Sequence, residues 1–114
     1  MMENKIYSFI GLAKKAGKLV SGEETCERAV KANKIFLVIV ADDASENTKK
    51  KFGDICGYRG IEVRYFGEKK LLGKCIGKDI RSVVAVSGRE FAERLKQLID
   101  SRSIEYGGGI IGES

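Results

Sequence analysis

The longest apolar run of the chain is IFLVIVA, at residues 35–41. Its part from Phe36 to Val40 is continuously apolar and rich in branched side chains, which is typical of a strand covered on both faces. Such a strand lies inside a sheet with helices packed against it. The run therefore predicts an α/β fold with a buried central strand.

Apolar residues on both sides of this run recur with the spacing of helices and strands. Helical spacing predicts helices at residues 6–16, after Ser21, between Ser45 and Gly60, at 68–76, and beyond 87. Extended segments are predicted at residues 19–20, 61–66 and 83–86. Strands that alternate with helices indicate a mixed sheet sandwiched between helical layers.

Polar residues at the predicted helix starts are candidates for side-chain caps. Ser21 and Glu24 have the S-x-x-E spacing of a capping box at the start of the second helix. Asp42, Asp43 and Ser45 are cap candidates for the third helix, and we expect a capping role for the two aspartates rather than a ligand contact. The short fourth helix is expected to bury Leu71, Leu72 and Cys75.

The length and composition of the chain correspond to one globular domain. It has 114 residues, of which 43% are apolar and 32% charged. The apolar periodicity stops at about Ser101, and three consecutive glycines follow at residues 107–109. We therefore predict a domain over residues 1–100 and a flexible, Gly-rich C-terminal tail over residues 101–114.

The chain carries an excess of positive charge, with 21 Lys and Arg against 16 Asp and Glu, a formal net charge of +5. This excess favours a polyanionic partner such as nucleic acid, because binding releases counterions. A basic surface without such a partner explains the charge equally well. The motifs must decide between the two.

Several classes of function lack the residues they require. The sequence has no His, and Cys26, Cys56 and Cys75 form no C-x-x-C pair, which argues against a disulfide framework, a zinc site and a His-activated nucleophile. Cys26 and Cys56 are expected to be packed free thiols. Residues 67–74 and 107–112 lack the spacing or flanking elements of phosphate-binding loops. The apolar run is too short to span a membrane. We predict a cytoplasmic protein that is no enzyme and takes no cofactor or small-molecule substrate.

Four segments recur in an order and spacing that resemble a known family. LVSGEETCERAV at residues 19–30 precedes KIFLVIVADDA at 34–44, LGKCIG at 72–77 and VVAV at 83–86. The pattern, spread over about residues 6–95, resembles the L-seven-Ae and L-thirty-e ribosomal proteins, most closely their bacterial YlxQ-type members. The resemblance implies a three-layer α-β-α sandwich that binds kink-turns, which are sharply bent RNA elements with tandem sheared G·A pairs.

The family signature K-G-x-N-E-x-x-K falls at the start of the second helix. Its positions correspond to Ser21, Gly22, Glu24, Thr25 and Arg28, with Glu23 at the variable position. Gly22 and Arg28 match the signature in kind, and the other three differ.

The residue types in this segment suit RNA binding. A helix N-terminus presents free N–H groups to phosphate, and Gly22 allows close approach of the backbone. Glu23 or Glu24 can accept from the N–H edge of guanine, and Arg28 can pair with phosphate or a base. Glu24 alternatively acts only as a cap.

The resemblance implies a second contact region in the loop after LGKCIG, which touches an extruded nucleotide. Here an exposed apolar residue beside basic ones can pack against a splayed base. The loop comprises Lys78, Asp79, Ile80, Arg81, Ser82 and Val83, of which Asp79 is not a predicted contact. Alternatively, Ile80 and Val83 lead into a buried strand. Lys69 is a candidate phosphate contact or a solvated surface residue.

These observations predict a monomeric, non-catalytic protein that binds structured RNA in a bacterial cytoplasm, in a ribosome- or translation-associated role. The RNA is expected to be kink-turn-like, with ribosomal RNA as a candidate. The main alternative is a protein-interaction module that keeps the fold and has lost RNA binding.

Overall fold

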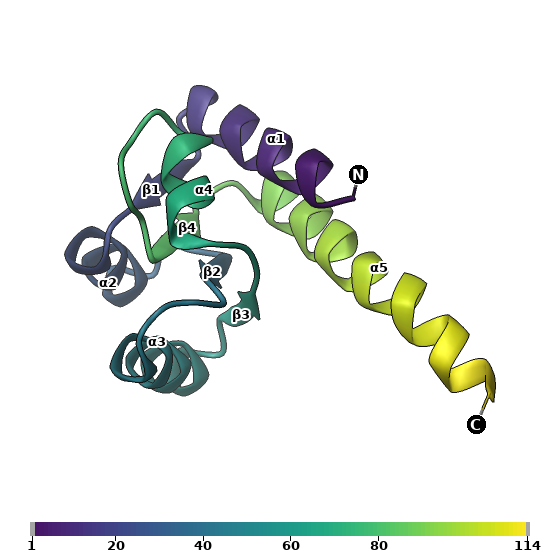
Figure 1. Ribbon diagram of the computed structural model, residues 1–114. Helices are drawn as coiled ribbons and strands as arrows, with labels where there is room; N and C mark the ends of the chain where they lie inside the picture. The colour runs from purple at the N-terminus through teal and green to yellow at the C-terminus, as the bar shows by residue number, and fades with distance from the viewer. Residues whose placement is uncertain (1, 114) are drawn as a thin grey trace.

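The computed structural model describes the backbone of residues 2–113 and the side chains of residues 2–102. Five helices and four strands follow one another over this range (Figure 1). Their order along the chain is α1 (Met2–Lys15), β1 (Leu19–Ser21), α2 (Glu23–Lys31), β2 (Leu37–Val40), α3 (Glu46–Arg59), β3 (Glu62–Tyr65), α4 (Lys69–Lys74), β4 (Val83–Val86) and α5 (Arg89–Glu113).

The four strands form one mixed sheet with the order β1-β4-β2-β3. β4 pairs antiparallel with both β1 and β2, whereas β2 and β3 are parallel. All four residues of β2 are fully buried, as are those of β4. The prediction of a central strand between Phe36 and Val40 is therefore confirmed, with Phe36 itself lying just outside the strand and 38% exposed.

Helices cover both faces of the sheet (Figure 1). α1 and α5 pack together on one face, where the rings of Phe9 and Phe91 lie 5.3 Å apart between centroids. α2 and α3 pack together on the other face. The predicted three-layer sandwich with a small mixed sheet is confirmed. Within residues 2–102 its core is one cluster of buried apolar side chains that includes Ile10, Val38 and Phe52.

Several predicted helix boundaries and thiol positions are confirmed. Ser45 caps α3, accepting a 3.1 Å hydrogen bond from the Thr48 amide, and Gly60 ends that helix in a left-handed conformation. Cys26 and Cys56 are buried free thiols. Burial raises the pKa of Cys26 to about 12 and that of Cys56 to about 11, so both stay protonated and unreactive at neutral pH.

The predicted capping box is wrong. The N-cap of α2 is Gly22, which has no side chain to cap with, and the Ser21 hydroxyl instead accepts a hydrogen bond from Arg81. Asp43 does cap a helix, but its carboxylate accepts from the Lys69 amide at the start of α4 rather than from α3. In both cases the side chain binds a donor that is distant in sequence instead of an amide of the adjacent helix.

The fourth helix is shorter than predicted and buries a different set of residues. Leu72 is buried as expected, whereas Leu71 is 38% exposed and Cys75 is only partly buried. Gly73 and Ile76 complete the buried side of this segment. The side of this segment that faces the core is therefore the one with Leu72, Gly73 and Ile76, and not the predicted one with Leu71 and Cys75.

The last helix extends through residues 101–113, where the sequence predicts a flexible tail. Side chains beyond Arg102 lie outside the described residues, so the boundary between domain and tail stays a prediction. Among residues 2–113, no helix combines the length and the apolar character needed to cross a bilayer.

Candidate nucleic-acid interface

The predicted RNA-contacting segments meet at one end of the sheet because of the strand directions. β1 is antiparallel to β4, so its last residue, Ser21, pairs with Val84 near the start of β4. The Gly22 amide donates a 3.0 Å hydrogen bond to the Val83 carbonyl, which joins the start of α2 to the end of the Lys78–Val83 loop. The Ala41 amide donates to the Ser82 carbonyl at 2.8 Å, which joins the same loop to the end of β2.

The α4 helix joins this group through its first residue. The Lys69 carbonyl accepts a 3.1 Å hydrogen bond from the Arg81 amide, while the Lys69 amide donates to Asp43 at 2.9 Å. The structure therefore brings the α2 start, the α4 start and the loop together. Asp43 is part of this arrangement, but nothing in the local sequence signals its contact because Lys69 lies 26 residues away.

The start of α2 leaves its backbone N–H groups available. Gly22 has φ 95° and ψ 148°, a conformation that L side chains rarely adopt, and it turns the chain from β1 into the helix. The Gly22 carbonyl accepts from the Cys26 amide at 2.9 Å, and no side chain caps the helix. Uncapped amides and the positive end of the helix dipole suit an anion such as phosphate.

Glu24 and Arg28 are exposed on α2, and Thr25 between them is partly buried. Glu24 and Arg28 have no side-chain hydrogen bond or ion pair within residues 2–102. Two side chains of opposite charge are therefore free to meet a ligand beside the helix start.

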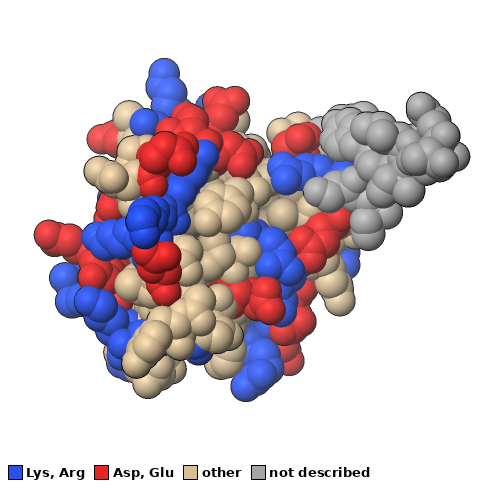
Figure 2. All heavy atoms as spheres, turned by 90° about the horizontal axis from the view of Figure 1, so that it is seen from below, with Lys and Arg blue, Asp and Glu red and all other residues tan. Residues whose placement is uncertain are grey.

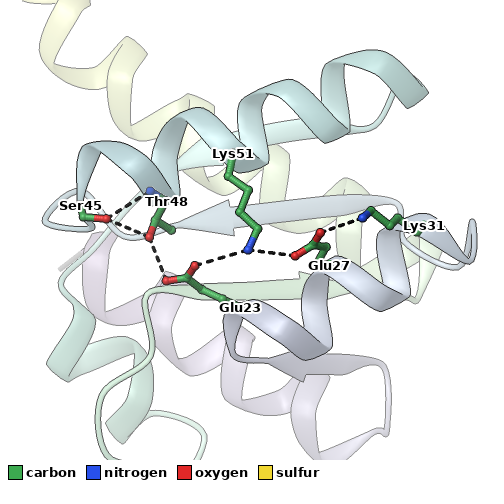
Figure 3. Close-up of polar contacts among 6 residues, drawn as sticks. All are labelled: Glu23, Glu27, Lys31, Ser45, Thr48 and Lys51. Carbon is green, nitrogen blue, oxygen red and sulfur yellow. Dashed lines mark hydrogen bonds and ion pairs between the residues drawn. The ribbon is translucent and has the colours of Figure 1, made fainter.

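Glu23 points toward α3 and links α2 to it (Figure 3). Its Oε2 accepts a 2.8 Å hydrogen bond from the Thr48 hydroxyl, and its Oε1 lies 3.9 Å from Lys51 Nζ. Lys51 also pairs with Glu27 at 2.9 Å, and Glu27 pairs with Lys31 at 2.8 Å. The carboxylate of Glu23 is thus engaged in packing two helices together, which the sequence does not reveal.

Glu27 gives this α2–α3 network a pH dependence. Hydrogen bonds from Lys31 and Lys51 lower the pKa of Glu27 to about 2. A lowered folded-state pKa contributes stability that is present above the ordinary value of 4.5 and lost as the pH falls toward 2. We expect wild-type protein to be more stable than Glu27→Gln at pH 7, with the difference shrinking below about pH 4.

Urea unfolding of both proteins from pH 7 to pH 3 measures this difference. Glu90→Gln is the control, because Glu90 is exposed on α5 and has no ion pair within residues 2–102. A stability difference between wild type and Glu27→Gln that is the same at every pH would contradict the assignment.

The loop presents some predicted contacts and buries others. Lys78 is exposed, and Ile80 is 53% exposed despite its apolar side chain. Arg81 and Ser82 are partly buried, whereas the side chain of Val83 is fully buried in β4. Val83 therefore follows the buried-strand alternative, and its carbonyl already accepts from the Gly22 amide. Ile80 follows the loop alternative.

The cations of the candidate site are uncompensated. Lys69 and Lys78, like Arg28, form no ion pair within residues 2–102. On the lower face of the molecule, by contrast, Figure 2 shows Lys and Arg interspersed with Asp and Glu around an uncharged strip. The basic side chains are therefore not distributed uniformly over the surface without acidic neighbours.

Comparison with known proteins identifies relatives over most of the chain. Residues 4–96 match the profile of the ribosomal protein L7Ae/L30e/S12e/Gadd45 family. The chain is 38% identical to "RNA-binding protein YlxQ" of Bacillus subtilis over 94 residues, covering 82% of this chain and 94% of that protein. It is also 38% identical to "RNA-binding protein YlxQ" of Enterococcus faecium, covering 84% of this chain and 92% of the relative.

Solved structures share the fold. A protein of unknown function from Bacillus halodurans superposes with a TM-score of 0.81 at 42% identity, covering 84% of this chain and 97% of that one. The Giardia lamblia 15.5kD RNA binding protein superposes with a TM-score of 0.72 at 15% identity, covering 88% and 86% of the two chains. At that identity the second likeness concerns the fold alone.

Proposed function

The chain belongs to the ribosomal protein L7Ae/L30e/S12e/Gadd45 family, and we propose that it is a non-catalytic protein that binds structured, kink-turn-like RNA. The observation that carries this proposal is the uncapped start of α2, with Gly22 at the turn and Arg28 exposed six residues further along. The two YlxQ relatives, which this chain matches over more than nine-tenths of their length, are named as RNA-binding proteins. We assign the protein to the bacterial cytoplasm as a monomer in a ribosome- or translation-associated role, with ribosomal RNA as the candidate partner.

Each free group at the site has a chemical counterpart in folded RNA. The amides at the start of α2 and the side chain of Arg28 bind phosphate oxygens or a base edge. The Glu24 carboxylate accepts from guanine N–H groups, and Thr25 lies beside it. The exposed Ile80 packs against a splayed base, while Lys69 and Lys78 neutralise phosphates. Glu23 supports α2 through its contact with Thr48 of α3. Ser82 and Val83 support the site from within, because their carbonyls accept from the Ala41 and Gly22 amides.

The proposal predicts tight binding to a kink-turn RNA and much weaker binding to the same RNA with its G·A pairs replaced. Arg28→Ala should weaken kink-turn binding by roughly 1–3 kcal/mol, since it removes a charged contact to a base or phosphate. It should leave thermal stability nearly unchanged, because the side chain is exposed. Affinity should also fall as salt rises.

Fluorescence titration of both RNAs at several salt concentrations tests this. Arg59→Ala is the matched control. Arg59 is also an exposed arginine, but it lies in the last turn of α3, which is not one of the segments of the candidate site. Equal and weak binding to both RNAs would indicate a generic basic surface. If neither RNA bound, a protein partner on the same fold would become the better explanation.

A further inference from the structure

Arg81 makes contacts with all three segments of the candidate site. Its backbone amide donates to the Lys69 carbonyl at 3.1 Å, at the start of α4. Its Nε donates to the Ser21 hydroxyl at 3.0 Å, immediately before the Gly22 turn. Its Nη1 donates to the carbonyl of Ile80 at 2.9 Å, within the loop itself.

We infer that Arg81 and Ser21 form a clamp that holds the α2 start, the α4 start and the loop in one fixed arrangement for RNA. Both are then positioning residues, and Ser21 affects affinity without touching RNA. The inference rests on the proposed RNA-binding function and adds how the contact segments are held in register.

The loop tip packs against Gly73 of α4, but apart from this clamp few hydrogen bonds hold it. The Lys78 amide donates to the Gly73 carbonyl at 2.8 Å, and the Ser82 carbonyl accepts from Ala41. Between these two points, the amides of Asp79 and Ile80 have no hydrogen bond within the described residues. A loop that is ordered before binding loses less conformational entropy when RNA arrives.

The chemistry of the two side chains suits a clamp. The guanidinium of Arg81 is planar, so fixing Nε on Ser21 and Nη1 on the Ile80 carbonyl fixes the orientation of the whole group. A hydrogen bond from a charged donor is stronger than a neutral one, and Ser21 and Arg81 are both partly buried, which limits competition from water. Lysine at position 81 keeps the charge but cannot reproduce this geometry.

A double-mutant cycle on the full chain tests the clamp. Ser21→Ala should weaken kink-turn binding by about tenfold, the effect of one lost charge-assisted hydrogen bond. Arg81→Ala should have a similar or larger effect, and Ser21→Ala combined with Arg81→Ala should be no worse than the larger single change. Ser21→Thr keeps the acceptor and should retain most of the affinity.

Salt dependence separates a clamp from a direct contact. Ser21→Ala should leave unchanged the slope of the logarithm of affinity plotted against the logarithm of salt concentration. Lys78→Ala, the matched loop control, should reduce the magnitude of that slope by about one. Additive effects of Ser21→Ala and Arg81→Ala, together with a reduced slope for Arg81→Ala alone, would make Arg81 an independent phosphate contact and overturn the clamp.

Amide hydrogen exchange of the free protein tests the same clamp without RNA. The hydrogen-bonded amides of Lys78 and Arg81 should exchange faster in Ser21→Ala and in Arg81→Lys than in wild type or Ser21→Thr. Unchanged exchange overturns the clamp whatever the RNA result. If wild-type protein binds no kink-turn RNA but Ser21→Ala speeds exchange, the clamp stands and the proposed function fails.

Discussion

Gly73→Ala is expected to lower the free energy of unfolding by at least about 3 kcal/mol and to abolish RNA binding. Gly73 is buried in α4, and a Cβ built on it would overlap the carbonyl oxygen of Asp79 and approach the Ile80 Cα to 3.2 Å. Both neighbours are backbone atoms, so no side-chain rotation can relieve the overlap. The loop must move away from α4, which separates Ile80 from the other proposed contacts.

Urea unfolding and kink-turn titration measure the two effects. Gly57→Ala is the matched control, because Gly57 lies in α3 and a Cβ there would meet no atom within 4 Å. That change should stabilise the protein by roughly 0.5–1 kcal/mol, as alanine is the better helix former. Gly73→Ala protein that is as stable as wild type would show that the loop is not packed against α4 as described.

Gly22→Asn is expected to cost about 1–3 kcal/mol of stability and to reduce RNA affinity at least tenfold. The reason is backbone strain alone, because a Cβ at Gly22 would meet no atom within 4 Å. With ψ at 148°, Gly22 lies in a region that is essentially restricted to glycine. A side chain there forces the turn to change, and the α2 amides then no longer face the same direction.

Gly60→Asn provides the comparison, because both glycines have positive φ and differ in ψ. Gly60 has φ 71° and ψ 25°, the left-handed helical conformation that asparagine tolerates. The same substitution should therefore be mild at Gly60 and costly at Gly22. Thermal melts give the stability, and titration well below each melting temperature gives the affinity. Equal effects at the two positions would rule out the backbone explanation.

Features set by short stretches of sequence were predictable. The apolar run around Val38 specified a buried strand, because alternation is lost only when both faces are covered. Ser45 and Gly60 specified the two ends of α3, because a cap acts on amides or carbonyls within one helical turn. The segments that carry the candidate site could be named for the same reason, through motifs that each occupy a few consecutive residues.

The uses of individual polar side chains were not predictable in the same way. Ser21 has the spacing of a capping residue, but its hydroxyl accepts from Arg81, which is 60 residues away. Glu23 stands among the signature residues, but its carboxylate accepts from Thr48 on α3. A local cap is one of several partners of similar strength, and the choice depends on which donors the fold brings near.

By itself, the sequence determined that this protein has an α/β fold with a buried strand at Phe36–Val40, and it indicated which segments carry the candidate site. Only the tertiary structure decided that β4 lies between β1 and β2, and this placement brings Gly22, Lys69 and Arg81 to one end of the sheet. The physical reason is how far apart in the sequence the interacting residues lie. Strand and helix formation depend on periodicity over a few residues, whereas strand order and hydrogen-bond partners depend on contacts between segments that meet only in the folded chain.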